Sequence, residues 1–224
     1  MRDLPLSEAP LVTRALRYLF FAIVVRAVIL IALGLTVRHR ERLPAKGPAV
    51  LAANHNSHLD TLALMSLFPL RLLPRLRPVA AADYFFKTKG RGWFASNIIG
   101  IIPVERGGTA QGGNPLAACE DALDRGDILI IFPEGSRGEP EAFQAFKKGI
   151  GHLAKARPKA PVIPVFMHGL GKALPKGTVL FVPFNCTVSV GELLYGKDSY
   201  EPFVAELEVA MTALAAEEKL PVWA

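Results

Sequence analysis

The chain has 224 residues, of which 51% are hydrophobic, and a formal net charge of +6. A chain of this length and apolar content can bury one full α/β core plus an appendage, which excludes a second catalytic domain. Its two cysteines, Cys119 and Cys186, are too few and too far apart for a disulfide framework or a zinc ribbon, and they indicate a reducing compartment.

The positive charge is concentrated in the first half of the chain. Residues 1–110 contain fifteen Lys or Arg against six Asp or Glu, whereas the remainder is slightly acidic. Such asymmetry indicates that the first half faces an anionic partner, either nucleic acid or a membrane surface. The apolar residues around these charges favour the membrane.

A long apolar run from Tyr18 to Leu35 has basic residues at both ends and Arg26 near its middle. A central arginine costs about 2.5 to 3.5 kcal/mol on insertion scales, so we favour monotopic attachment to one leaflet over a single spanning helix. The predicted organisation is a membrane-attachment helix or helical pair in residues 1–42, followed by one domain in 43–224. The expected location is the cytoplasmic face of the inner membrane.

The stretch Asn54–Asp60 lies between a short apolar strand, Ala49–Ala53, and a helical pattern from Leu59 to Phe68. On such a loop, Asp60 can accept a hydrogen bond from one ring nitrogen of His55 and leave the other nitrogen as a base. Two alternatives stay open. Ser57 and Asp60 also match a capping box, and His55, His58 and Asp60 partly match the H-x-H-x-D-H pattern of binuclear zinc hydrolases.

Two stretches mix basic with apolar or aromatic residues, namely Phe68–Pro78 and Tyr84–Phe94. Such a mixture can bind RNA, but no nucleic-acid fold signature accompanies it. We interpret both stretches as surface that docks on lipid headgroups, with a solvated basic face as the alternative.

Two further apolar strands end in charged, glycine-rich loops. The first, within Asn97–Val104, leads to Glu105 and Arg106, and the second, Asp127–Phe132, leads to Pro133–Gly138. An arginine followed by glycines can bind a phosphate. The guanidinium donates two parallel hydrogen bonds, and glycines let backbone N–H groups come close to the phosphate oxygens. For the second loop, a surface ion pair of Glu134 with Arg137 is the alternative.

The other elements predicted from the pattern are helices and strands that complete the domain. They are a helix from Asn114 to Arg125, a helix from Phe146 to about Ala156, a strand at Val162–Phe166, a hairpin of Thr178–Val182 with Cys186–Val190, and a helix from Tyr200 to about Glu218.

Taken together, these stretches resemble the glycerolipid acyltransferases, the family of 1-acyl-glycerol-3-phosphate and lysophospholipid acyltransferases. The family's N-H-x-S-x-x-D motif matches Asn54–Asp60, G-x-x-P-V-x-R matches Gly100–Arg106, F-P-E-G-[ST]-R matches Phe132–Arg137, and a V-P-V-like strand is similar to Val162–Val165. The four blocks occur in the family's order.

The resemblance implies an α/β fold with a mixed, largely parallel central sheet flanked by helices. It implies transfer of an acyl chain from acyl-CoA or acyl-carrier protein to the hydroxyl of a lysophosphatidic-acid-like lipid, with membrane lipids as partners and no nucleic acid. By this analogy His55 is the general base and Asp60 orients it. Arg106 and Arg137 hold the acceptor phosphate, while Glu134, Gly135 and Ser136 shape that pocket. No metal or other cofactor is expected.

Two departures bear on the acceptor. Glu105 stands where the family often has aspartate, and His58 fills a variable position. Other branches with the same four blocks acylate lyso-ornithine lipids or lysophospholipids, so another lyso-lipid acceptor stays an alternative. A metal-dependent hydrolase and a non-catalytic membrane or RNA adaptor are the rivals from other classes.

Overall fold

We analysed a computed structural model, which describes residues 6–29, 33–57, 59–85, 88–105, 113–136, 144–173 and 184–217. The chain forms a seven-stranded sheet in the order β1-β7-β6-β2-β5-β3-β4. All neighbouring strands are parallel except β6 and β7. The predicted mixed, largely parallel sheet is confirmed. The strands are β1 (Leu33–Arg38), β2 (Ala49–Ala53), β3 (Leu76–Ala81), β4 (Ile102–Val104), β5 (Ile128–Ile131), β6 (Val162–His168) and β7 (Phe184–Val190).

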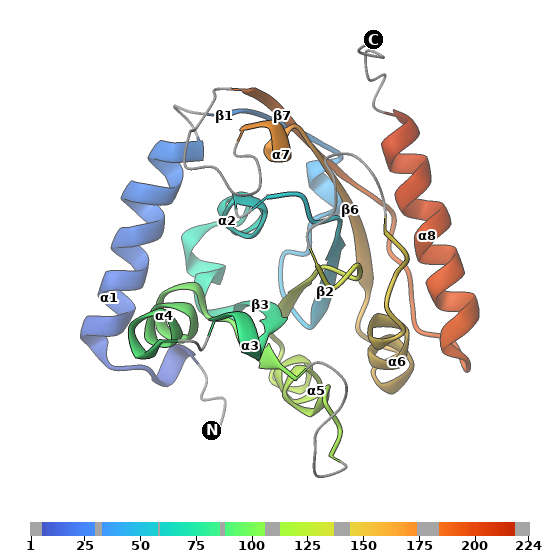
Figure 1. Ribbon diagram of the computed structural model, residues 1–224, viewed down its shortest axis with the longest axis horizontal. Helices are drawn as coiled ribbons and strands as arrows, with labels where there is room; N and C mark the ends of the chain where they lie inside the picture. The colour runs from blue at the N-terminus through green and yellow to red at the C-terminus, as the bar shows by residue number, and fades with distance from the viewer. Residues whose placement is uncertain are drawn as a thin grey trace.

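Helices cover both faces of this sheet. Figure 1 shows α1, α2 and α4 on one side of the sheet and α6 and α8 on the other. The α-helices are α1 (Leu11–Leu19), α2 (Leu59–Ser66), α3 (Ala82–Phe85), α4 (Lys89–Phe94), α5 (Ala117–Asp124), α6 (Gly149–Ala156), α7 (Leu170–Ala173) and α8 (Tyr200–Glu217). Short 3-10 and π-helical segments are η1 (Leu6–Glu8), η2 (Phe20–Val25), η4 (Arg40–Arg42), η5 (Leu70–Arg75) and η6 (Ala95–Ile99).

The central strand β2 is buried along its whole length, which explains why its sequence is continuously apolar rather than alternating. Its side chains divide between two cores because successive residues point to opposite faces. Leu51 packs with Phe21 and Val25 of η2 and with Leu64 of α2. Val50 packs in a second core, to which α5, α6 and α8 contribute Leu123, Leu153, Phe203 and other residues.

The apolar run at residues 18–35 does not form one helix to its end. It begins in α1 and continues through η2, but Leu33–Leu35 belong to β1, which pairs in parallel with β7. Gly34 and the β-branched Thr36 and Val37 lower helix propensity there, and β7 supplies partners for the strand's backbone. The predicted helix or helical pair of residues 1–42 therefore does not extend into Leu33–Arg38. Within the described part of the chain, no helix combines the length and apolarity needed to cross a bilayer. The division of the chain at residue 42 stays a prediction.

The interpretation of Phe68–Pro78 as lipid-docking surface is wrong for its second half. Leu76–Ala81 form β3, and the side chain of Arg77 is only 1% exposed and donates from Nε to the carbonyl of Gly100 at 2.9 Å. Arg75 is engaged as well, with Nη1 2.7 Å from the carbonyl oxygen of Arg125. The alternation of leucine with arginine is no in/out period of a strand, because Leu70–Arg75 form η5, and Leu76 and Arg77 of β3 are both buried.

Two other predicted elements differ in part. Ile98 and Ile99 lie in η6, so the predicted strand within Asn97–Val104 is reduced to β4. The second strand of the predicted hairpin is β7, which pairs with β6 and β1, while Thr178–Val182 lie outside the described residues.

Candidate active site

The candidate site lies at the carboxyl ends of β2 and β5. These strands are parallel neighbours, so the segments that follow them, Asn54–Ser57 and Phe132–Ser136, leave the same edge of the sheet. In open α/β sheets this edge is where ligands bind. Two of the sequence motifs, far apart in the chain, are therefore brought together by strand order.

His55 and Asp60 form a hydrogen-bonded pair. The distance between His55 Nδ1 and Asp60 Oδ2 is 2.9 Å. A carboxylate can only accept, so the proton of this bond is on Nδ1 and the neutral ring keeps Nε2 as a base. The His55 side chain is 21% exposed and that of Asp60 is 0% exposed. The pair therefore has a buried orienting group and a base that solvent or a substrate can reach.

The same carboxylate oxygen also caps α2. Asp60 Oδ2 accepts from the backbone N–H groups of Asn56 at 2.6 Å and of Ser57 at 2.8 Å. Ser57 Oγ accepts from the N–H of Leu59 at 3.3 Å. The capping interpretation and the catalytic interpretation of Asp60 are thus compatible, because one oxygen satisfies the loop's donors and holds the imidazole.

Phe132 fixes the plane of the His55 ring. The two rings are stacked with centroids 4.1 Å apart and planes 20° from parallel. Contact on one face and a hydrogen bond at one edge leave the imidazole little freedom to turn. Phe132 is the first residue of the F-P-E-G-[ST]-R block, and nothing in the sequence alone indicated this contact with His55.

Asn54 fastens the loop to the neighbouring strand. Its side chain is 2% exposed, donates from Nδ2 to the carbonyl of Met167 at 2.8 Å, and accepts at Oδ1 from the Met167 N–H at 2.7 Å. The β2–β6 pairing has its last register partners at Ala53 and Val165. The side-chain amide of Asn54 extends the hydrogen-bond ladder between β2 and β6 by one step. It therefore fixes the position of the next residue, His55, relative to the end of β2.

Glu134 braces the loop from the β5 side. Its carboxylate is 1% exposed, and Oε1 accepts from the backbone N–H of His55 at 3.3 Å. Burial raises the pKa of Glu134 to about 7, and the negative charge of Asp60 adds to this, while N–H donors of His55 and Gln144 oppose it. Glu134 is buried rather than on the surface, whereas Arg137, its partner in the ion pair considered as an alternative, lies outside the described residues.

Gly135 and Ser136 complete the turn after β5. Gly135 has φ +73°, a conformation that side chains other than hydrogen rarely adopt, and its N–H donates to the carbonyl of Phe132 at 3.0 Å. Ser136 Oγ donates to Gln144 Oε1 at 3.2 Å. The residues that shape this turn also tie it to the segment before α6.

Three residues singled out from the sequence, His58, Arg106 and Arg137, lie outside the described residues. Their predicted roles stay predictions. Glu105 follows β4 at the same edge of the sheet, two strands away from β5. Among the described residues, no group of three His, Cys, Asp or Glu side chains is arranged to hold a metal ion.

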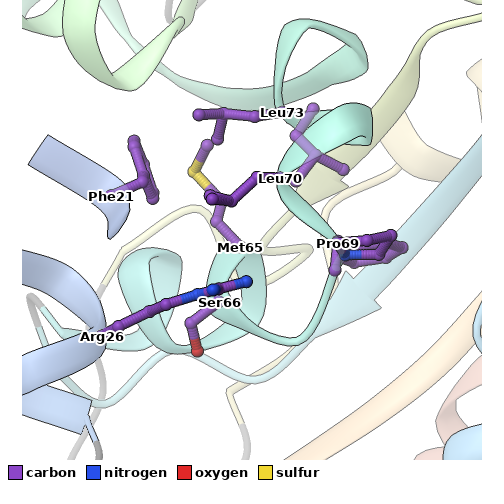
Figure 2. A pocket seen from close by; sticks show the side chains of 9 residues that line it. Phe21, Arg26, Met65, Ser66, Pro69, Leu70 and Leu73 are labelled. Atoms are coloured by element: carbon purple, nitrogen blue, oxygen red, sulfur yellow. The ribbon is translucent and has the colours of Figure 1, made fainter. Parts of the chain in front are cut away.

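An apolar pocket lies between the N-terminal helical segment and α2. Its lining is shown in Figure 2, where Phe21 and Arg26 approach from one side and Met65, Leu70 and Leu73 from the other. Apart from Arg26 and Ser66, all the residues that line it are apolar. The pocket lies beside the last turn of α2, the helix whose first turn contains Asp60.

Comparison with known protein families decides the classification. The family model described as Acyltransferase matches residues 34–168, which is more than half of the chain. The chain belongs to the acyltransferase family. The match contains both His55 and Asp60, as well as the turn after β5.

Several curated acyltransferases are similar in sequence. A chloroplastic 1-acyl-sn-glycerol-3-phosphate acyltransferase of Brassica napus is 30% identical over 139 residues, covering 62% of this chain and 38% of the relative. The human 1-acyl-sn-glycerol-3-phosphate acyltransferase alpha is 28% identical over 155 residues, covering 69% of this chain and 52% of the relative. The chain thus matches about two fifths to one half of the length of these relatives.

A solved structure shares the fold. The crystal structure of the 1-acyl-sn-glycerophosphate acyltransferase of Thermotoga maritima superposes with a TM-score of 0.71 at 22% identity, and covers 92% of this chain and 80% of that one. The N-terminal helix, the sheet and the flanking helices of this chain therefore belong to a known architecture.

Proposed function

We propose that this protein transfers a fatty acyl chain from an acyl thioester to the free hydroxyl of a lysophosphatidic-acid-like lipid. The observation that carries the proposal is the His55–Asp60 pair, with Nδ1 held at 2.9 Å by a buried carboxylate and Nε2 left as a base. The names of the similar acyltransferases support the choice of acceptor. Another lyso-lipid acceptor is the alternative within the same chemistry.

The proposed reaction is direct transfer without an acyl-enzyme. His55 Nε2 removes the proton from the acceptor hydroxyl as its oxygen attacks the thioester carbonyl carbon. The tetrahedral intermediate then expels the thiolate, which takes the proton back from the imidazolium, so an ester and a free thiol are formed. Asp60 stabilises the imidazolium through its hydrogen bond to Nδ1.

The remaining site residues have binding roles in this proposal. Arg106 and Arg137 hold the acceptor phosphate, since a guanidinium fork matches phosphate geometry. Gly135 and Ser136 shape the pocket at the turn after β5, and Glu134 supports it from beneath through the His55 backbone. The donor is acyl-CoA or acyl-carrier protein, and we propose no metal or further cofactor.

The test is release of free thiol from acyl-CoA by the purified protein in detergent, with and without lysophosphatidic acid. We expect release only with the acceptor, and a loss of about 10² to 10⁴ in kcat for His55→Ala. Cys119 and Cys186 are both buried, so the native protein should add little background to a thiol assay. Release that needs no acceptor, or that survives His55→Ala, would contradict the mechanism and favour a hydrolase or an adaptor. Elemental analysis of the pure protein separates those two rivals.

A further inference from the structure

The segment Gln144–Lys147, just before α6, forms a wall of the candidate site. Two bonds of Gln144 reach the turn after β5: its backbone N–H donates to the Glu134 carboxylate, and its side-chain Oε1 accepts from Ser136 Oγ at 3.2 Å. The N–H of Lys147 donates to the carbonyl of Pro133 at 2.8 Å. Three hydrogen bonds therefore hold this segment against the turn whose Glu134 supports His55.

Lys147 lies across that turn. A side-chain carbon built on Gly135 would be 3.3 Å from Lys147 Cγ and 3.6 Å from Lys147 Cε. The aliphatic part of Lys147 therefore covers Gly135, the residue between Glu134 and Ser136. Its backbone N–H is bonded to Pro133 and its stem packs on Gly135, so the Lys147 side chain is placed at the turn after β5.

The Lys147 ammonium has no protein counter-charge among the described residues. The residue is exposed, and none of the ion pairs or side-chain hydrogen bonds of the described part of the chain involves its Nζ. The next residue, Lys148, differs: its Nζ lies 5.6 Å from the centroid of the Tyr200 ring at the start of α8. The stem of Lys147 thus packs on the turn after β5, whereas the ammonium of Lys148 lies near the start of α8.

We infer that Lys147 is a phosphate-binding residue of this site, adding a cation that the sequence motifs did not identify. The inference rests on the proposed function, because both substrates of that reaction carry phosphate: the acceptor on its headgroup, and the donor on its CoA or carrier prosthetic group. An ammonium on a flexible stem binds phosphate as a point charge, and no carboxylate of the described residues forms an ion pair with the Lys147 ammonium.

The experiment compares Lys147→Met with Lys148→Met, which remove the same charge one residue apart. Methionine keeps the length of the stem over Gly135. KM is measured for lysophosphatidic acid at saturating acyl-CoA, and for acyl-CoA at saturating lysophosphatidic acid. We expect Lys147→Met to raise one of these constants about tenfold, as the loss of a charge-assisted hydrogen bond predicts. Lys148→Met should leave both within about twofold, and Lys147→Arg should restore most of the affinity.

The outcomes separate the two sources of phosphate. A rise in the KM for lysophosphatidic acid alone assigns Lys147 to the acceptor, and a rise in the KM for acyl-CoA alone assigns it to the donor. Equal behaviour of Lys147→Met and Lys148→Met, or a fall in kcat with both KM values unchanged, would overturn the inference. A parent protein that releases no thiol would instead contradict the proposed function itself.

Discussion

At the scale of single residues, Asp60 performs two tasks with one oxygen atom. Oδ2 meets the imidazole of His55 and the N–H groups of Asn56 and Ser57. A helix N-terminus has unsatisfied N–H groups, and a catalytic histidine needs an acceptor at Nδ1. The loop bends so that all these donors converge on the same acceptor. A substitution of Asp60 will therefore affect both the helix start and the base.

Glu134 makes stability depend on pH. Burial raises the pKa of Glu134 in the folded protein to about 7, from 4.5 for an exposed glutamate. The folded state thus binds the proton more tightly, so the free energy of unfolding should fall as pH rises from about 4.5 to about 7, by on the order of 2 kcal/mol. Above this pH range the stabilising contribution of protonated Glu134 is fully lost, and below it that contribution is fully present.

Glu134→Gln should remove this dependence, because glutamine can still accept from the His55 N–H and carries no charge. The measurement is urea unfolding of parent and variant at pH 5 and pH 8. We expect the variant to gain stability relative to the parent at pH 8. An identical pH dependence in both proteins would show that another group causes the effect.

At the scale of elements, α1 is attached to the domain by a buried arginine. Arg17 is 3% exposed and donates from Nη2 to the carbonyls of Leu73 and Leu76 at 3.0 and 3.3 Å. Burial lowers the pKa of Arg17 to about 9, and the neighbouring positive charge of Arg77 adds to this. Gly100 admits the guanidinium, since a side-chain carbon there would collide with Arg17 Nη1 and Leu6 Cδ1.

We therefore expect Gly100→Ala to destabilise the protein by about 2 to 4 kcal/mol, because φ is +82° and Arg17 must move. Limited proteolysis should then cut preferentially near α1. Gly90→Ala is the matched control: Gly90 lies inside α4 with no atom within 4 Å of an added carbon. It should stabilise by about 0.5 to 1 kcal/mol. Equal effects of the two substitutions would contradict the role of Gly100.

The pocket between η2 and α2 has room for about one water molecule in this structure, and we propose that it takes part of an acyl chain when its lining side chains move apart. Leu70 lines it and is only partly buried, so a larger side chain there need not disturb the core. Leu70→Trp should narrow the pocket and shift the preference toward shorter acyl chains by about tenfold, as the transfer free energy of two methylenes predicts. The assay is kcat/KM across a series of acyl-CoA lengths. An unchanged chain-length profile would place the acyl chain elsewhere.

At the scale of the whole molecule, exposed apolar side chains gather on the outer side of the N-terminal helix and on α4. We call this the α1–α4 surface; it consists of Val12, Leu16, Leu19, Ile23, Trp93 and Phe94, each between 41% and 71% exposed. Its two parts meet through Phe20 and Phe94, whose ring centroids are 5.4 Å apart. The exposed Lys89 and Arg91 of α4 lie in the same stretch. We propose that this surface inserts into one leaflet, since such a pattern is typical of interfacial helices.

Leu16→Glu combined with Leu19→Glu should weaken binding to vesicles of phosphatidylcholine and phosphatidylglycerol at least tenfold. Burying each leucine contributes about 1 kcal/mol, and a carboxylate is repelled by anionic lipid. Val209→Glu is the control, because Val209 is 70% exposed on α8, on the opposite side of the sheet in Figure 1. Sedimentation with vesicles measures the binding. If Val209→Glu weakened binding as much as the double substitution, the α1–α4 surface would have no special role.

Most of the strands and the hydrogen bond between His55 and Asp60 were predictable from the sequence because their signals are local. β2 and β5 are continuous apolar runs, and His55 and Asp60 are close enough in the chain for a loop and a helix start to bring them together. The family, the mixed sheet and the acyltransferase motifs follow from such short patterns. Local patterns could not distinguish β1 from the apolar helix before it, or β3 from a basic surface, because each is stabilised by a distant strand.

Tertiary structure alone decided which side chains surround His55. Strand order places Phe132 on the ring of His55 and the Glu134 carboxylate under its backbone, although these residues are more than seventy positions apart in the chain. Burial decided that Arg17 and Arg77 are internal rather than lipid-facing, and that Lys147 rather than Lys148 faces the turn after β5. Which side chains are buried or face the site depends on how helices and loops pack on the sheet. It is therefore a property of the whole folded chain and not of any one segment.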